Sequence, residues 1–204
     1  MLQFITHTTE RFPLPSDGAM AALDGGCRWI QLRMKGAAES ELLAEGRRLR
    51  GLCDRYGAKL IVDDHVELVG PIGADGVHLG LSDMPVAEAR RILGPGVIIG
   101  ATANRFEHIA RAAADGADYI GLGPFRFTTT KERLSPVLGL EGYRSVMAQV
   151  RQAGIGLPVV AIGGITAADV SDLMAAGVSG IAVSGSILRA ADPVKETETI
   201  LARL

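Results

Sequence analysis

Short apolar runs rich in Val, Ile or Leu recur along the chain at fairly even spacing. None of them alternates regularly between apolar and polar side chains. Continuous runs of this kind are typical of strands buried on both faces, as in a parallel sheet covered by helices. We predict eight strands, at Leu2–Thr6, Trp29–Leu32, Leu60–Val62, Gly76–Leu79, Val97–Gly100, Tyr119–Leu122, Val159–Ile162 and Gly180–Val183.

Amphipathic patterns with helical spacing lie between these runs. In the longest, Ser40–Cys53, four leucines fall roughly on one face, with acidic residues near its start and arginines near its end. That charge order suits the helix dipole. Thr166 is a plausible N-cap for a later helix. The remaining predicted helices are Ser16–Leu23, Val86–Leu93, Phe106–Ala114, Leu140–Ala153, Ala167–Ala176 and Pro193–Leu204.

A similar short segment connects a predicted helix or loop to the next predicted strand three times, at Gly73-Ala-Asp-Gly76, Gly116-Ala-Asp118 and Gly177-Val-Ser-Gly180. Glycine is the expected stop at a helix C-terminus. The repetition indicates an α/β fold in which a strand–helix unit occurs about eight times. We therefore expect a (β/α)₈ TIM barrel, and one domain over residues 1–204, because no linker divides the chain. A doubly wound open sheet is the competing architecture, but no glycine-rich dinucleotide loop follows the first strand.

Composition and charge narrow the class of protein. The chain has 204 residues, of which 48% are hydrophobic and 22% charged, with a net charge of −2. Without a basic block, nucleic acid is not the expected partner. The N-terminus lacks the features of a signal peptide and no apolar run is long enough for a membrane span, so we expect a cytoplasmic protein without a membrane partner. Cys27 and Cys53 are expected to be packing residues.

The second predicted strand ends in three polar residues that alternate along the chain, Gln31, Arg33 and Lys35. Alternation directs them to one side, toward the barrel interior or its mouth, where active sites of this fold lie. Two cations facing inward are costly unless they meet an anion. The alternative, solvation beyond the strand end, remains open, mainly for Lys35.

Carboxylates follow the third and fourth strands, at Asp63, Asp64 and Asp83. Because those strands are neighbours, the side chains can converge, and oxygen ligands with room for water suit Mg²⁺. Asp83 has the alternative role of capping the helix that follows Pro85. His78 lies within an apolar strand and is better explained as a hydrogen-bonded core histidine.

Later strand ends add hydroxyls, an amide and glycines. Thr102 and Asn104 follow the fifth strand, and the long segment from Pro124 to Gly139 suggests a mobile lid. Glycine N–H groups after the last two strands suit a phosphate. Two anion sites, one cationic and one glycine-rich, favour two phosphorylated small-molecule substrates. The anion-binding candidates in these loops are Thr128, Thr130, Lys131, Gly164, Ser184 and Gly185.

Several motifs in this order resemble the thiamine-phosphate synthase family over nearly the whole chain. The matching segments are Gln31-Leu-Arg-Met-Lys35, Asp63-Asp64, Asp75-Gly-Val-His-Leu-Gly80 with Asp83, Gly121-Leu-Gly-Pro124, Thr128-Thr-Thr-Lys131, Leu138-Gly-Leu-Glu-Gly142 and Pro158-Val-Val-Ala-Ile-Gly-Gly-Ile165. The resemblance implies a transferase of thiamine biosynthesis. It would join 4-amino-2-methyl-5-pyrimidinylmethyl diphosphate to a thiazole phosphate and release pyrophosphate.

The resemblance also implies residue roles. Mg²⁺ would be held by Asp64 and Asp83 on the diphosphate, and Thr102 stands where the family usually has a serine near the pyrimidine and the leaving group. Arg33, Thr102 and Lys131 are the catalytic candidates. The diphosphate would also contact Gln31, Arg33, Lys35 and Lys131. The thiazole phosphate would be bound by Thr128, Thr130, Gly164, Ser184 and Gly185.

Three departures from the family pattern accompany the resemblance. Asp63 replaces a common asparagine and, as a substrate-binding residue, would accept a hydrogen bond from the amino group of the pyrimidine. Asn104 replaces a common histidine. Ser184-Gly185 replaces an apolar-serine pair, so the phosphate contact would come from the backbone, with Ser184 or Ser186 assisting. Competing functions are a thiazole tautomerase, a non-catalytic protein that binds a phosphorylated metabolite, and a sugar-phosphate epimerase. The tautomerase would not need the metal acids or the lysine, the binding protein would be Mg²⁺-independent, and the epimerase would not need the diphosphate cradle. A homo-oligomer is possible.

Overall fold

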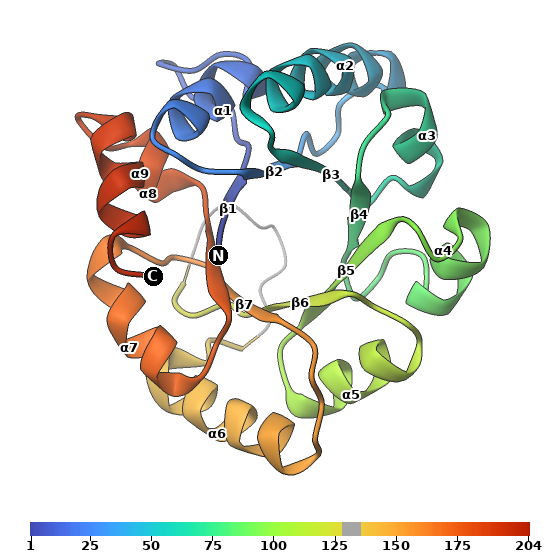
Figure 1. The fold of residues 1–204 in the computed structure, drawn as a ribbon, viewed down its shortest axis with the longest axis vertical. Helices are drawn as coiled ribbons and strands as arrows, with labels where there is room; N and C mark the ends of the chain where they lie inside the picture. The colour runs from blue at the N-terminus through green and yellow to red at the C-terminus, as the bar shows by residue number, and fades with distance from the viewer. Residues whose placement is uncertain (128–135) are drawn as a thin grey trace.

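The computed structural model describes residues 1–127 and 136–204, and its eight parallel strands close into a barrel in sequence order (Figure 1). Helices form a ring around the strands. The predicted (β/α)₈ architecture is therefore confirmed, and each predicted strand lies within one residue of an observed strand except at the end of the fifth. The strands are β1 Leu2–Ile5, β2 Trp29–Leu32, β3 Lys59–Asp63, β4 Gly76–Leu79, β5 Ile98–Ala103, β6 Tyr119–Leu122, β7 Val159–Ile162 and β8 Gly180–Val183.

The helices follow the predicted ranges closely, with three additions, one of which is the four-residue helix α8 (Gly185–Leu188). Between β3 and β4 lie a 3₁₀ turn, η1 (Val66–Leu68), and a four-residue helix, α3 (Val69–Ile72), which the sequence pattern did not reveal because Gly70 and Pro71 interrupt it. The ring otherwise comprises α1 Pro15–Asp24, α2 Glu39–Tyr56, α4 Val86–Leu93, α5 Phe106–Ala114, α6 Gly139–Gln152, η2 Ala167–Asp169, α7 Val170–Ala176, α8 Gly185–Leu188 and α9 Pro193–Leu201.

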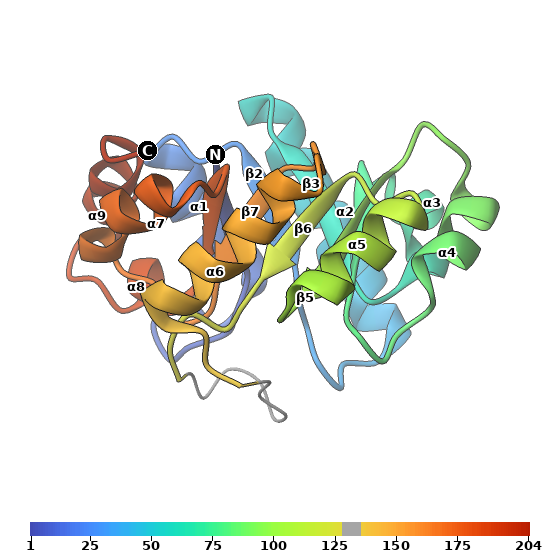
Figure 2. The same cartoon turned by 90° about the horizontal axis from the view of Figure 1, so that it is seen from below.

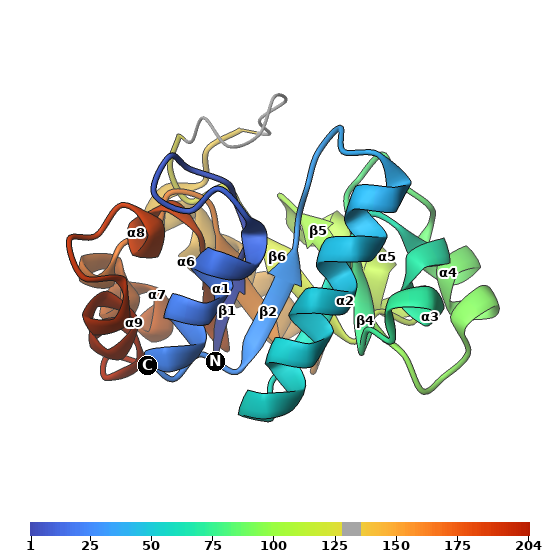
Figure 3. The same ribbon diagram turned by 90° about the horizontal axis from the view of Figure 1, so that it is seen from above.

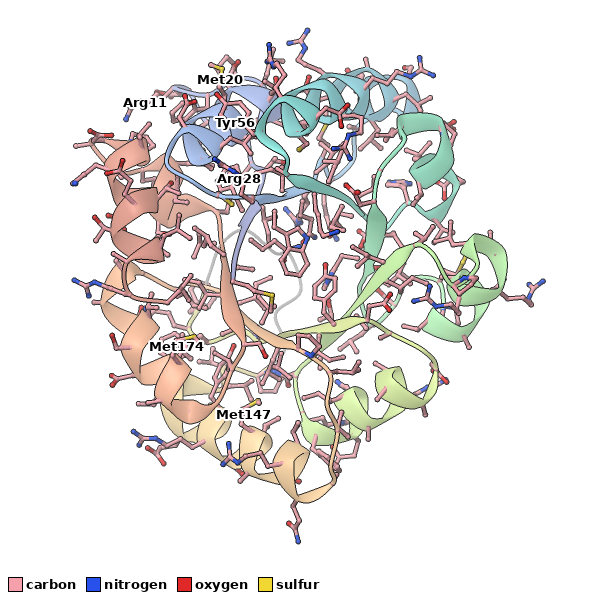
Figure 4. All side chains as sticks on the ribbon, in the orientation of Figure 1. Arg11, Met20, Arg28, Tyr56, Met147 and Met174 are labelled. Carbon is pink, nitrogen blue, oxygen red and sulfur yellow. The ribbon has the colours of Figure 1, made fainter. Side chains whose placement is uncertain are left out.

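The hydrophobic core lies on both sides of the strands. One buried cluster fills the space between strands and helices and includes Leu49 of α2, Ile109 of α5 and Met147 of α6. A smaller cluster inside the barrel contains Ile5, Tyr119, Val160 and Ala182. Figure 4 shows side chains within the ring of strands and between it and the helices. This two-sided burial explains why the strands read as continuous apolar runs.

The repeated helix–strand joints have a common function at the N-terminal end of the barrel. In each joint, a polar side chain before one strand accepts a hydrogen bond from the first or second backbone N–H of the preceding strand: Asp75 from Leu60, Asp118 from Ile99, and Ser179 from Val159. Arginines from α2, α4 and α6 reach the same joints. Their contacts are Arg50 to Asp75 and to the Ala58 oxygen, Arg90 to Asp118 and the Gly116 oxygen, and Arg151 to the Ala176 oxygen.

Both chain termini lie at this same end of the barrel, as Figures 2 and 3 show. An outer contact there joins the segment between α1 and β2 to α2, where the guanidinium of Arg28 lies 5.6 Å from the ring centre of Tyr56 (Figure 4). Within the described ranges, no helix combines the length and the apolar character that crossing a membrane requires.

Candidate active site at the C-terminal end of the barrel

A cavity of about 450 Å³ opens at the end of the barrel where the strands terminate. It brings together every sequence-predicted site residue within the described parts of the chain. Thr128, Thr130 and Lys131, and with them half of the expected lid, lie outside the described residues. The predicted residues that line the cavity are Gln31, Arg33, Lys35, Asp63, Asp64, Asp83, Thr102, Gly164, Ser184 and Gly185.

The cationic side of the cavity is organised by Asp63. Its carboxylate accepts a hydrogen bond from Gln31 Nε2, and its Oδ2 lies 3.5 Å from Nε of Arg33. Thr6 at the end of β1 accepts a 2.9 Å bond from the Arg33 backbone N–H. The strand therefore points Gln31 and Arg33 inward as predicted, and the acid that departs from the family pattern holds both side chains in place.

Asp64 and Asp83 converge from β3 and the β4–α4 loop. Burial raises the pKa of Asp64 to about 8, with further contributions from the charge of Asp63 and from a hydrogen bond to Asp83. Asp64 has φ of 66°, the only positive φ at a non-glycine position among the described residues. Such strained backbone is found at functional sites. Asp83 does not cap α4, whose N-cap is Pro85; its Oδ2 accepts a 2.6 Å bond from the Gly80 N–H.

This pair fits Mg²⁺ as the ion usually binds in substrate complexes, with one or two carboxylates and the remaining ligands from water and phosphate. In the described parts of the chain, no group of three or more His, Cys, Asp or Glu side chains is arranged to hold a metal by itself. The pKa of Asp64 stays raised although the charge of Lys35 acts to lower it, and a cation bound between the two carboxyl groups would favour the ionised form of Asp64.

His78 is a core histidine, as the sequence suggested, but it also lines the cavity. Its Nδ1 lies 3.0 Å from the Tyr119 hydroxyl and its Nε2 lies 3.0 Å from Oγ1 of Thr102. Because β5 extends to Ala103, Thr102 lies inside the strand and not beyond it. The histidine therefore links the barrel interior to a predicted catalytic residue.

The opposite wall is formed by the ends of β7 and β8. Gly163 and Gly164 have φ of 96° and 71°, which favours glycine. The hydroxyls of Ser184 and Ser186 are buried without a hydrogen-bond partner among the described residues. A Cβ on Gly185 would lie 2.4 Å from Nη1 of Arg189, so that guanidinium lies directly over the start of α8. Glycine amides, hydroxyls and a cation together suit a phosphate group.

The sequence analysis named Ser186 as an assisting hydroxyl but did not identify Arg189 as a member of this wall. Arg189 is four residues beyond Gly185, one helical turn, which brings its side chain back over the glycine. The four-residue spacing could have indicated this contact, but only if a helix had been predicted there. Because α8 is only four residues long, it gives no periodic pattern from which to predict it.

The β6 and β7 loops are tied together beside the cavity. Arg126 donates from Nη1 to Oδ2 of Asp169 at 2.8 Å and from Nη2 to Oδ1 at 2.7 Å, and Nη1 also donates to the Gly164 oxygen. The Arg126 pair lowers the pKa of Asp169 to about 2. Asn104 donates to the oxygens of Gly123 and Pro136. These bonds fix the bases of the segment that carries the Thr-rich motif.

Comparisons with known proteins agree with this geometry. A family model described as "Thiamine monophosphate synthase" matches residues 2–187. A thiamine-phosphate synthase of Phocaeicola vulgatus is 61% identical over 200 residues, covering 98% of this chain and 96% of the relative. One from Bacteroides fragilis is 58% identical and covers 98% of both chains.

Among solved structures, thiamine phosphate pyrophosphorylase from Pyrococcus furiosus is 37% identical with a TM-score of 0.86, covering 99% of this chain and 94% of that one. A 3-hexulose-6-phosphate synthase, 17% identical with a TM-score of 0.71, shares the fold. The extent and identity of these matches show that the chain belongs to the thiamine monophosphate synthase family.

Proposed function

We propose that this chain joins 4-amino-2-methyl-5-pyrimidinylmethyl diphosphate to a thiazole phosphate, giving thiamine phosphate and pyrophosphate. The reaction is a transferase reaction of thiamine biosynthesis, in agreement with the family of the chain. The observation that carries the proposal is one cavity with a cationic, carboxylate-rich wall facing a glycine-rich wall. Two phosphorylated substrates need both walls, whereas one monophosphate would need only the second.

The cationic wall is the proposed diphosphate site. Gln31, Arg33 and Lys35 contact the diphosphate oxygens, and Asp63 keeps the first two directed into the cavity. Asp64 and Asp83 hold Mg²⁺, which when bound neutralises charge that develops on the leaving diphosphate. Lys131 adds a further cation in the proposal, as the resemblance implies. Fixed charges aimed at the leaving group lower the barrier to its departure.

The glycine-rich wall is the proposed thiazole-phosphate site. Backbone N–H groups at Gly164 and Gly185 and the hydroxyl of Ser184 approach the phosphate, and Thr128 and Thr130 would also bind it, as the resemblance implies. Across the cavity, the electron-rich pyrimidine stabilises positive charge on its methylene carbon as the C–O bond breaks. The thiazole nitrogen then forms the new C–N bond. The residues act mainly by positioning the two substrates and excluding water.

The defining experiment mixes both substrates with and without Mg²⁺ and follows pyrophosphate and thiamine phosphate. Both products should appear only with the metal ion, and Asp64→Ala and Lys131→Ala should remove most of the activity. Full activity in both variants would contradict the assigned roles. Ligand binding without turnover would favour the non-catalytic alternative, and isomerisation of the thiazole alone would favour the tautomerase.

The proposal also includes a cytoplasmic site of action and leaves a homo-oligomer possible. Cell fractionation and light scattering of the purified chain test these two points. Neither result affects the chemistry assigned to the cavity, because all the residues invoked belong to one chain.

A further inference from the structure

A line of polar side chains crosses the apolar interior of the barrel and ends at the cavity. Gln3 of β1, Tyr119 of β6 and His78 of β4 are 2%, 3% and 5% exposed. Gln3 Nε2 donates to the Tyr119 hydroxyl at 3.2 Å, and the two histidine contacts described above continue the line to Thr102. Burying three polar side chains in this position is costly unless each hydrogen bond is made.

The barrel leaves space for the two rings of this line. Gly100 of β5 is paired in register with His78 on one side and with Tyr119 on the other. A Cβ on Gly100 would lie 2.1 Å from Cζ of Tyr119 and 2.5 Å from its oxygen. A Cβ on Gly121 of β6 would lie 2.9 Å from Cε1 of His78. Both glycines have ordinary strand backbone, so it is the rings, and not unusual dihedral angles, that require them.

The proposed hydrogen bonds of this line run in one direction. The Tyr119 oxygen accepts from the Gln3 amide, and in this arrangement the phenolic hydrogen is donated to Nδ1 of His78. Burial raises the pKa of Tyr119, so the phenol remains protonated and a donor. With Nδ1 as acceptor, the neutral imidazole carries its hydrogen on Nε2 and donates it to Oγ1 of Thr102. The Thr102 hydroxyl therefore directs its own hydrogen away from the ring, toward the cavity that it lines.

We propose that Gln3, Tyr119 and His78 fix the Thr102 hydroxyl as a hydrogen-bond donor to the substrate, which makes Tyr119 and His78 positioning residues. With its hydrogen directed in this way, the Thr102 hydroxyl binds a substrate atom that can accept a hydrogen bond. The role in catalysis rests on the proposed function, in which the acceptor is an oxygen of the departing diphosphate. A preset donor costs no reorientation at the moment when negative charge develops there.

The direct test is the tautomer of His78, measured by ¹⁵N NMR of histidine-labelled protein with the His78 signals assigned from their loss in His78→Gln. The wild-type chain should show hydrogen on Nε2 and a bare Nδ1. Tyr119→Phe, which keeps the ring and removes the donor, should abolish the uniform tautomer. Tyr143→Phe, which removes another buried tyrosine hydroxyl, bonded to the Leu122 oxygen, should leave it unchanged. Hydrogen on Nδ1 in the wild type would overturn the proposal.

The kinetic test asks whether Tyr119 acts through Thr102. Thr102→Val should lower kcat about 100-fold, as for loss of one transition-state donor, while Thr102→Ser retains activity. Tyr119→Phe should lower kcat about 10-fold with little change in KM, in line with loss of an outer supporting bond. In the Thr102→Val background, Tyr119→Phe should have no further effect.

The positioning role and the proposed function would be refuted by different results. A further 10-fold loss from Tyr119→Phe in the Thr102→Val background would show an independent effect and overturn the positioning role. A wild-type chain that forms no thiamine phosphate but shows the expected tautomer, and its loss in Tyr119→Phe, would refute the proposed function and leave the hydrogen-bond direction standing. Thermal unfolding of each variant identifies any loss of activity caused by misfolding.

Discussion

Replacing Asp64 by Asn should stabilise the metal-free protein while removing its response to Mg²⁺. The native carboxyl has a pKa of about 8, against 3.8 in a solvated chain, mainly because it is buried and secondly because it lies near Asp63. A raised acid pKa means that the unfolded chain loses its proton first as the pH rises. Stability therefore falls from pH 3.8 up to pH 8 and is constant above and below.

The structure sets the size of this effect. Between pH 3.8 and pH 7 the penalty grows by about 1.36 kcal/mol per unit, which gives a ceiling of about 4 kcal/mol. Asp64 is only partly buried, so solvent screening reduces the expected gain from Asp64→Asn to about 1–2 kcal/mol. Asparagine also tolerates the left-handed backbone at this position, so the substitution adds no strain.

Urea unfolding with a chelator at pH 7 and pH 4 provides the assay. The variant should be more stable at pH 7 and nearly equal to wild type at pH 4, which lies close to the pKa of 3.8 in the solvated chain, so that little of the penalty has yet developed. Mg²⁺ should stabilise the wild type and not the variant. Asp172→Asn on the exposed face of α7 is the control and should shift stability by less than about 0.5 kcal/mol. A loss of stability in Asp64→Asn at pH 7, or an equal gain at both pH values, would refute the reasoning.

Three further predictions concern arginines. Arg126→Met should lower the free energy of unfolding by only about 1 kcal/mol near neutral pH, because half of the Arg126 side chain is exposed. The low pKa of Asp169 gives stability that is present above pH 3.8 and is lost as the pH falls toward 2, so the variant should unfold in acid at a higher pH than the wild type. Arg90→Met removes hydrogen bonds to Gly94, Val97, Gly116 and Asp118 from a side chain 21% exposed, and urea unfolding should show a loss of about 2–4 kcal/mol. The 80% exposed Arg111 is its control and should cost less than about 0.5 kcal/mol on the same change. Arg189→Met should raise the KM for the thiazole phosphate about tenfold and leave that for the pyrimidine diphosphate unchanged, whereas equal changes in both would remove Arg189 from the phosphate wall.

The barrel and much of the cavity could be predicted because their signals are local. Buried parallel strands give apolar runs, and the residues at their ends must meet once the barrel closes, which is why Gln31, Asp64 and Thr102 came together as expected. The extension of β5 through Thr102 and the short α3 escaped prediction, since neither has a periodic pattern. The roles of Thr128, Thr130 and Lys131 stay predictions, as does the single domain over residues 1–204.

Other features could not be predicted because they depend on pairings far apart in the chain. The role of Asp63 became clear only when Gln31 and Arg33 were found against it, 32 and 30 residues earlier in the sequence. Likewise, no sequence rule connects Gln3 to Tyr119, which are 116 residues apart and on strands that are not neighbours. A single sequence shows that a polar residue is buried but not which partner satisfies it.

The capped joints built on Asp75, Asp118 and Ser179 place the determinants of strand register at one end of the molecule and the chemistry at the other. Residues at the cavity end of the barrel are therefore not needed to hold the strands in register. A mutational library confined to the C-terminal ends of β2, β5 and β8 would consequently change substrate preference while the barrel stays folded. Substitutions at the joints would instead disturb strand register and, through it, the positions of all the loops around the cavity.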